Sequence, residues 1–257
     1  MGALEVDEPA DGVVRLTISN PAKRNALDRE ILDALAATLP VLDARCVVLT
    51  GAGTIFSAGY DIGDLAPERL AEEAAALVAH PFQAALEALD AVAPPVVAAL
   101  NGHAIGGGLE LALACDLRVA ADGARMGMPP ARLGLVYSHT GLRRFLEAIG
   151  GARTRELFFT ARLIDAREAL GWGLVNEVVE RGEVAARGVA LAAEIAALSP
   201  LSVRGNKRVL RELLAAPLDP AVTAELDALR EAAFRSADFA EGVRAFVEKR
   251  DPVWNDR

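Results

Sequence analysis

The sequence predicts an α/β protein in which short buried strands alternate with helices and pair in parallel. Short apolar runs, each ended by a turn with glycine, asparagine or proline, recur through the first two thirds of the chain; such runs are typical of strands buried on both faces. A helical pattern follows most of these turns, as in parallel sheets. With 257 residues, 53% of them hydrophobic, the chain is long enough to bury a sizeable core.

Strands and helices can be placed in the N-terminal part from these runs. Asp28 has the side chain of an N-cap and predicts a helix from Arg29 to Leu39. A second, apolar helix is expected from Leu109 to Cys115. The irregular spacing of the units excludes a simple solenoid. The four strands are expected at Val13–Ser19, Cys46–Thr50, Val96–Leu100 and Leu117–Ala120.

From Glu147 onward the pattern becomes mostly helical. Alanine, leucine, arginine and glutamate recur at helical spacing, and only Val175 to Val179 has strand character. The segment from Ala185 to Leu198 is apolar over much of its circumference. Its surface either meets another subunit or packs within the chain, and the sequence leaves both open. We expect a core domain over residues 1–195 and a helical region over 196–257.

Composition and charge restrict the class of protein. The net charge of −9 and the pI near 5.0 weigh against nonspecific nucleic-acid binding. No long uncharged apolar stretch and no signal pattern occur, so we expect no membrane segment, no secretion and a cytoplasmic location. Cys46 and Cys115 lie in apolar segments without CxxC spacing, which argues against a metal site or a disulfide framework.

The stretch from Pro94 to Asp116 carries the first functional signal. A buried strand leads through Asn101-Gly102 and three glycines, Gly106 to Gly108, into a helix. Glycines let the backbone approach a ligand closely, and the first N–H groups of a helix have no intrahelical partner. Such a site suits an oxygen that gains negative charge. Glu110 lies one turn inside this helix, close enough to carry a proton to or from a ligand bound there. Tight helix packing and a phosphate-binding loop are the alternative interpretations of the glycine run.

A second stretch, Gly51 to Leu65, leaves the preceding strand in the same way. It passes through the small residues Ser57, Ala58 and Gly59. Parallel strands end their C-terminal turns at one edge of a sheet, so this turn and the glycine run are expected to face each other. Two opposed N–H groups would then hold one carbonyl oxygen as it becomes an oxyanion.

These stretches, with three further segments, resemble the crotonase (enoyl-CoA hydratase/isomerase) superfamily. The matches follow the family's order over nearly the whole chain. They are KRNAL (23–27), SAGYDIGDL (57–65), NGHAIGGGLELALACDLRVA (101–120), ARLIDAREALGWGLVNEVV (161–179) and AFVEKR (245–250). The resemblance implies a spiral of ββα units with a helical C-terminal trimerisation region, assembled as a homotrimer or a dimer of trimers.

The resemblance also implies a ligand. The substrate would be an acyl-CoA thioester, with coenzyme A part of the substrate and no separate cofactor or metal. The two N–H groups that hold the thioester carbonyl fall on Ala58 and Gly107, and the shared chemistry is an enolate. The remaining residues expected to contact the thioester are Lys23, Arg24 and Ala26 near the nucleotide, Tyr60, Asp61, Ile62, Gly106 and Pro130 near the acyl group, and Phe246 and Lys249 from a neighbouring subunit.

The side chains depart from the commonest pattern of the family. Hydratases use two glutamates, one at the position of Glu110 and one about twenty residues later, where this chain has Pro130. Half of the two-carboxylate apparatus is therefore missing unless another group substitutes. Related isomerases often carry an aspartate where a gap-free comparison places Ser138. Neither second carboxylate is present.

Tyr137 and His139 stand near those positions. His139, with a reference pKa of about 6.5, is a candidate acid or base, or a loop histidine bonded to backbone. The run from Pro130 to Phe145 resembles the methylmalonyl-CoA decarboxylases, which have a tyrosine at the place of Tyr137 but a histidine where this chain has Tyr60. Loss of carbon dioxide leaves the enolate that paired N–H groups stabilise.

Three functions remain open. Hydration or double-bond isomerisation of an enoyl-CoA through Glu110 is placed first, because this carboxylate is retained. Decarboxylation of a methylmalonyl-CoA-type thioester is the second. A noncatalytic acyl-CoA-binding protein that kept the fold is the third, and the missing glutamate at Pro130 is the feature in its favour.

Overall fold

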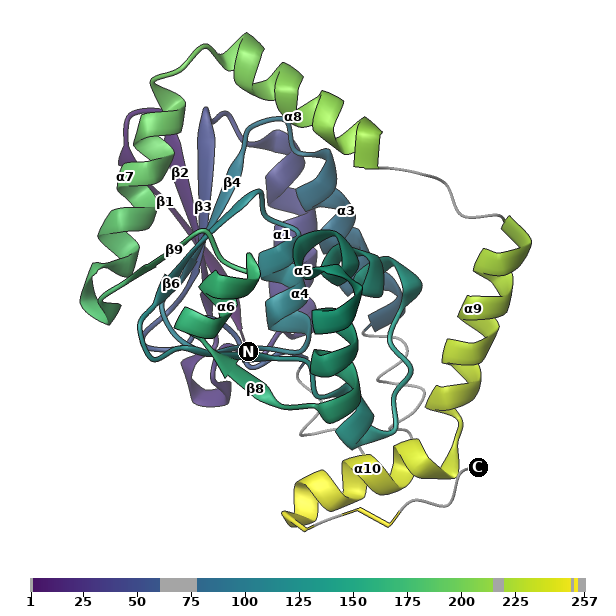
Figure 1. Ribbon diagram of the computed structural model, residues 1–257. Helices are drawn as coiled ribbons and strands as arrows, with labels where there is room; N and C mark the ends of the chain where they lie inside the picture. Colours follow the sequence, from purple (N-terminus) through teal and green to yellow (C-terminus); the bar gives the residue numbers. More distant parts are fainter. Residues whose placement is uncertain (1, 61–77, 215–219, 251, 254–257) are drawn as a thin grey trace.

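The computed structural model describes residues 2–60, 78–214, 220–250 and 252–253 (Figure 1). Its centre is a six-stranded sheet in the order β1-β2-β3-β4-β6-β9. Neighbouring strands from β2 to β9 pair in parallel, and β1 pairs with β2 antiparallel. The expected contacts of Asp61 and Ile62 with substrate lie outside the described residues. The strands are β1 (Ala3–Ala10), β2 (Val13–Ser19), β3 (Cys46–Gly51), β4 (Val96–Leu100), β6 (Leu117–Ala121) and β9 (Glu177–Val179).

The four predicted N-terminal strands are confirmed to within one residue. All residues of β3 and β4 are buried, as their continuous apolar runs predict. The strands that sequence patterns did not reveal are of two kinds. β1 is an exposed, acidic edge strand that forms a hairpin with β2 across the turn at Gly12. The others form a second sheet and are too short for a periodic pattern: β5 (Ala104–Ile105), β7 (Arg125–Gly127) and β8 (Leu163–Asp165).

Helices cover both faces of the large sheet (Figure 1). On one face lie α1 (Arg29–Thr38), whose N-cap Asp28 accepts from the Ile31 N–H, and α3 (Gln83–Ala91). On the other face α7 (Val184–Ala196) packs against β2, β3 and β4. A Cβ placed on Gly188 would lie 2.9 Å from the Ala99 Cβ, so helix and sheet are in close contact. The sheet-facing side of α7 therefore packs within the chain, while Ala185, Ala186 and Ala190 are exposed and Leu198, just beyond the helix, is 58% exposed.

Three further helices complete the core. They are α4 (Gly107–Leu113), α5 (His139–Thr160), which is interrupted at Gly150, and α6 (Ala166–Trp172). Short 3-10 turns are η1 (Pro21–Lys23), η2 (Leu39–Val41), η4 (Pro130–Leu133) and η5 (Arg181–Glu183), and η3 (Val78–Phe82) is a π-helical turn.

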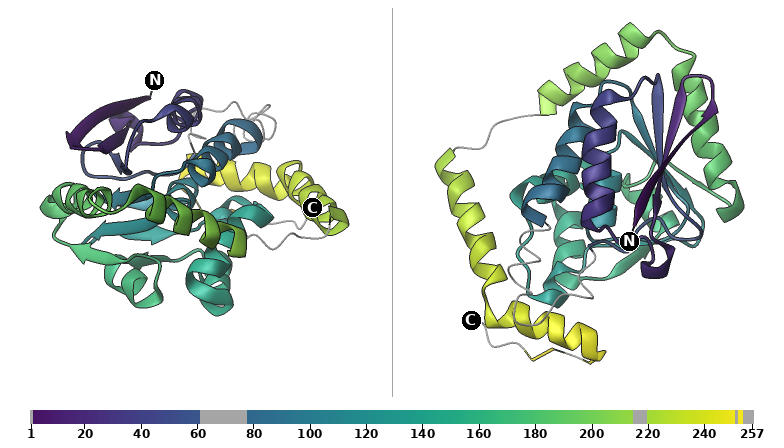
Figure 2. Two further views of the ribbon diagram at one scale, coloured as in Figure 1. Left: turned by 90° about the horizontal axis from the view of Figure 1, so that it is seen from above. Right: turned by 180° about the vertical axis from the view of Figure 1, so that it is seen from behind.

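The last three helices lie at the periphery. They are α8 (Pro200–Leu214), α9 (Pro220–Phe234) and α10 (Ala237–Glu248). In both Figure 1 and Figure 2, α8 crosses one end of the sheet while α9 and α10 lie towards the other. Arg204 donates to the Ala44 carbonyl (2.8 Å) and Lys207 to the Pro94 carbonyl (3.0 Å), which places α8 over the edge where β3 and β4 begin.

In the part of the chain that the structure describes, no single helix is long and apolar enough to cross a bilayer. By length and composition, the segments Arg181–Ala196 and Pro200–Arg211 meet the criterion together, as a pair bent by 105°.

The two cysteines give a first prediction. Cys46 and Cys115 are free and buried, and burial raises the pKa of each thiol to about 12. Because the thiolate is the reactive form, a thiol reagent at pH 8 is expected to leave the native protein unlabelled and to label two thiols after denaturation. Labelling of either thiol in the native protein at the denatured rate would show that these segments are not packed as described.

Candidate active site

The two glycine-bearing turns meet at the C-terminal edge of the sheet. The Ser57 N–H donates to the His103 carbonyl (3.1 Å), and the Ile105 N–H donates to the Ser57 carbonyl (3.0 Å). A Cβ placed on Gly59 would lie 2.8 Å from the Ile105 oxygen and 3.4 Å from the Gly107 nitrogen. The predicted apposition is confirmed, because parallel strands carry both turns to one edge.

Two buried asparagines hold these turns, and sequence reasoning missed their role. The Asn101 amide donates to the carbonyls of Gly51 and Gly53, both at 2.8 Å, and so joins the ends of β3 and β4. The Asn25 amide donates to the carbonyls of Ala52 (2.8 Å) and Ile55 (2.7 Å). An asparagine directly after a buried strand, as at Asn101, is the sequence signal that could have indicated one of them.

Replacing Asn101 with alanine is expected to destabilise the protein. The change leaves two carbonyl oxygens without their donor, and an unsatisfied buried polar group costs about 1–3 kcal/mol. Urea denaturation of Asn101→Ala should show a loss of this size. The matched control is Asn206→Ala on the exposed surface of α8, which should change stability little. Equal stability of the two variants would contradict the assigned role.

Glu110 lies in the first turn of α4, whose N-cap Gly106 has a positive φ of 55°. The residue is 1% exposed, and its Oε2 accepts a hydrogen bond from the Tyr137 hydroxyl. A carboxylate removed from water is stable only when polar groups compensate it. Tyr137 supplies one such group, and it does so from the segment in which the second glutamate is missing.

The N-terminal turn of α5 supplies a second group that stabilises the Glu110 carboxylate. A Cβ placed on Gly141 would lie 2.7 Å from Glu110 Oε1, so the carboxylate sits against the first turn of α5. The N-cap of this helix is Ser138, whose Oγ accepts from the Gly141 N–H (3.1 Å). The positive end of a helix dipole stabilises a nearby negative charge. Any side chain at position 141 would occupy the space that the Glu110 carboxylate needs.

Tyr137 stays protonated in this environment. Burial, followed by the neighbouring Glu110 and Tyr60, raises the pKa of the Tyr137 hydroxyl well above its usual value. Its ring packs on Phe158, with centroids 5.4 Å apart. The Tyr137 hydroxyl is thus a hydrogen-bond donor to Glu110 at neutral pH.

Tyr60 connects Tyr137 to the glycine turn. Its hydroxyl interacts with that of Tyr137, and a Cβ placed on Gly107 would lie 2.7 Å from the Tyr60 ring. The ring meets Phe82 edge to face, with centroids 4.9 Å apart. Tyr60 therefore lies over the Gly107 turn and beside the Glu110–Tyr137 pair.

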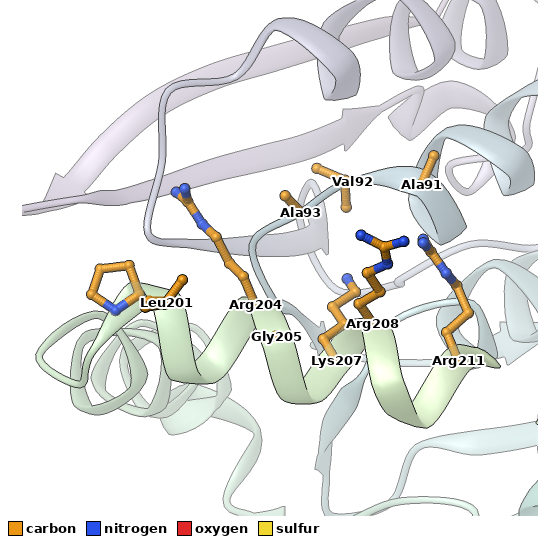
Figure 3. Close-up of a pocket in the computed structure, with 10 residues that line it drawn as sticks. Ala91, Val92, Ala93, Leu201, Arg204, Gly205, Lys207, Arg208 and Arg211 are labelled. Carbon is orange, nitrogen blue, oxygen red and sulfur yellow. The ribbon is translucent and has the colours of Figure 1, made fainter. Parts of the chain in front are cut away.

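A small, partly open cavity of about 20 Å³ lies here, with room for about one water molecule. Its walls are Tyr60, Phe82, Gln83, Glu110, Leu135, Val136, Tyr137, Ser138 and Phe234. A larger cavity of about 480 Å³ lies at the opposite edge of the sheet, under α8 (Figure 3). Its polar side chains are the cations Arg204, Lys207, Arg208 and Arg211. Without a carboxylate or a thiol in its lining, the larger cavity lacks a general base, so the smaller one is the candidate site.

Two predicted catalytic residues do not fit the site as expected. The Ala58 N–H donates to the Arg24 carbonyl (3.1 Å), so it is engaged within the protein and is not the second oxyanion donor in this conformation. His139 Nδ1 lies 3.4 Å from Asp227 Oδ1 on α9, and His139 does not line the cavity. Tyr137 precedes the N-cap Ser138 whereas His139 is the first residue of α5, and their side chains contact different partners, Glu110 and Asp227.

The predicted substrate-binding residues are spread more widely. Pro130 is buried in η4 and does not line the cavity, whose wall from this segment begins at Leu135. Arg24 and Lys23 are exposed at η1, next to the Ala58 turn, and Ala26 is buried. Phe246 and Lys249 are exposed on and just after α10. The site residues that sequence reasoning missed are Phe82, Gln83, Leu135, Val136, Gly141 and Phe234.

Comparison with known proteins decides the family. A model of the enoyl-CoA hydratase/isomerase family matches residues 8–257. The chain belongs to this family. The crotonyl-CoA hydratase of Syntrophomonas wolfei subsp. wolfei is 34% identical over 252 residues, 95% of this chain and 94% of the relative. The enoyl-CoA hydratase/isomerase family thus accounts for the order of motifs along the whole chain.

Two solved structures extend the comparison. Methylmalonyl-CoA decarboxylase in complex with 2-nitronate-propionyl-CoA superposes with a TM-score of 0.89 at 28% identity, covering 99% of both chains. The enoyl-CoA hydratase/isomerase from Pseudoalteromonas atlantica T6c superposes with a TM-score of 0.83 at 33% identity, covering 98% of this chain and 100% of the other. The predicted crotonase-like fold and the resemblance to methylmalonyl-CoA decarboxylase are confirmed.

Proposed function

We propose that this member of the enoyl-CoA hydratase/isomerase family hydrates an enoyl-CoA or moves its double bond, with Glu110 as the base. The observation that carries the proposal is the buried Glu110 carboxylate, which Tyr137 and the start of α5 hold in a cavity beside the Gly107 turn. A base in a water-poor cavity next to helix N-terminal donors can remove or deliver a proton at carbon while the donors stabilise an enolate.

In hydration, Glu110 would position a water molecule and take its proton as the oxygen attacks the β-carbon. The α-carbon of the resulting enolate would then receive a proton from the Glu110 carboxyl group. In isomerisation, the same carboxylate would carry a proton from one carbon of the acyl chain to another. One carboxylate suffices for either reaction if a second group keeps it in place. Tyr137 does this by donating a hydrogen bond to Glu110 Oε2.

The Gly107 N–H, at the start of α4, is our proposed first donor to the thioester oxygen. The second donor would come from the turn that ends at Tyr60, either by release of Ala58 from Arg24 or by a neighbouring N–H. Lys23, Arg24 and Ala26 would lie along the nucleotide part of the ligand. Coenzyme A enters as part of the substrate, and the proposal needs no further cofactor.

We also propose that the chain assembles as a homotrimer or a dimer of trimers through residues 196–257. Several large apolar side chains of this region are exposed in the single chain, which is the usual sign of an interface. They are Leu201, Val209, Leu210, Leu213 and Leu214 on α8, and Phe246 and Val247 on α10. A cytoplasmic location stays a prediction from the sequence.

Decarboxylation is the second candidate. The similarity to methylmalonyl-CoA decarboxylase supports it, as does the presence of Tyr137 in the cavity. The engagement of Tyr137 with Glu110 argues against it. A substrate carboxylate that took Glu110's place on the Tyr137 hydroxyl would lie beside a like charge, which is unfavourable in a buried site.

The test compares two substrates with the purified protein. With crotonyl-CoA, loss of the absorbance of the conjugated thioester is the expected result. If methylmalonyl-CoA releases carbon dioxide while crotonyl-CoA keeps its absorbance, the activity is decarboxylation and the proposal of hydration is wrong. Binding of butyryl-CoA without turnover of either substrate would favour the noncatalytic alternative and overturn the proposal.

A further inference from the structure

We propose that Phe234, carried by the helical C-terminal region, sets the acyl chain length that the Glu110 cavity accepts. The inference rests on the proposed function, because it assigns a wall of the same site. Phe234 is the last residue of α9 and only 7% exposed, and it lines the cavity that contains Glu110. A residue from a region expected to serve assembly thus closes the site of its own chain.

The other aromatic walls are held near the reacting atoms. Tyr60 packs against the Gly107 turn and Phe82, at the place where the thioester carbonyl would bind. Tyr137 is bonded to Glu110, beside the carbons that exchange protons. Neither ring can move without disturbing the chemistry. The distal part of an acyl chain must therefore extend along the remaining apolar walls.

Those remaining apolar walls are Phe82, Leu135, Val136 and Phe234. Val136 is 37% exposed and Leu135 is half-buried, whereas Phe234 is buried. Phe82 is buried as well, but its ring supports Tyr60 edge to face. Among the described lining residues, Phe234 is therefore the buried ring whose removal would open enclosed volume and leave Tyr60 supported. An enclosed apolar cavity of about 150 Å³ is large enough to bind benzene, so loss of a phenyl ring would make room for several methylene groups.

Phe234 is fixed by α10. The two rings Phe234 and Phe239 meet edge to face, with centroids 5.3 Å apart. α10 in turn packs backbone to backbone on the segment that leads to Tyr137. A Cβ placed on Gly242 would lie 2.6 Å from the Leu133 backbone, and one placed on Gly134 would lie 2.8 Å from the Asp238 backbone. The ring is therefore a defined wall of the cavity, held by α10.

The test measures affinity for saturated acyl-CoA thioesters, which bind without turnover. Calorimetric titration with butyryl-, hexanoyl- and octanoyl-CoA should show no gain with chain length for the wild type, because the buried Phe234 ring stands in the path of further methylenes. In Phe234→Ala, each added methylene should strengthen binding up to about fourfold. Phe234→Leu should show a smaller gain and serves if the alanine variant does not fold.

The matched control is Phe159→Ala on α5, where a ring of the same size is 78% exposed. This variant should keep the wild-type chain-length profile. The inference is overturned if Phe234→Leu and any folded Phe234→Ala keep the wild-type profile, or if the wild type itself gains affinity up to octanoyl-CoA. Failure of the wild type to bind any acyl-CoA would instead refute the proposed function.

Discussion

Glu110→Gln is expected to abolish hydration or isomerisation while leaving acyl-CoA binding nearly intact. The amide keeps the size of the side chain and still accepts from Tyr137, but it cannot take a proton. General acid–base catalysis contributes about 10²- to 10⁴-fold, and Glu110 is the carboxylate in the described cavity lining. The loss should therefore lie at the upper end of that range and appear in kcat, with little change in the affinity for butyryl-CoA.

The measurement is steady-state hydration of crotonyl-CoA together with butyryl-CoA titration. Glu30→Gln, an exposed glutamate in the first turn of α1, is the matched control and should behave as the wild type. If decarboxylation were the activity, Glu110→Gln should matter much less and Tyr137→Phe more, since the enolate then forms without a base. Retention of wild-type hydration in Glu110→Gln would remove Glu110 from the mechanism.

Gly107→Val is expected to lower kcat whether the reaction is hydration, isomerisation or decarboxylation. A Cβ at this position would lie 2.7 Å from the Tyr60 ring, so either the ring or the start of α4 must move. Movement of α4 displaces the Gly107 N–H. Loss of one oxyanion donor typically costs about 2.7–4 kcal/mol of barrier, or about 10²- to 10³-fold in kcat.

Two further variants test whether the loss of activity comes from displacement of the Gly107 N–H. Gly205→Val on α8, where an added Cβ would meet no atom within 4 Å, should leave activity unchanged. The double variant Tyr60→Ala/Gly107→Val removes the ring with which the new side chain collides and should recover part of the activity if the collision displaces the donor. Full activity of Gly107→Val alone would contradict the assignment of the oxyanion site.

The large sheet could be predicted from the sequence because its strands carry their own signal. β3 and β4 are buried apolar runs, β2 is rich in β-branched residues, and β6 is a short apolar segment with one arginine. Turns bound all four strands, and Asp28 caps α1 as expected. β5, β7 and β8 have two or three residues each and are defined only by their partners. Exposed β1 lacks the apolar pattern on which such predictions depend.

Part of the candidate site could also be predicted from the sequence, and part could not. Glu110, Gly107 and the apposition of the two glycine turns follow from local sequence, since strand, glycine turn and helix occur in order and parallel strands share an edge. The choice between Tyr137 and His139 does not follow from sequence. Two residues apart in the chain, they point to different neighbours, Tyr137 to Glu110 and His139 to Asp227.

By itself, then, the sequence determined the fold class, the family and the one retained carboxylate, because periodicity, turn residues and motif order are local properties of the chain. Only the tertiary structure decided which N–H groups are already engaged, as at Ala58, which groups hold Glu110, and that Phe234 closes the cavity. These are contacts between segments far apart in the chain. Their geometry depends on how helices and turns pack in three dimensions, which no local pattern records.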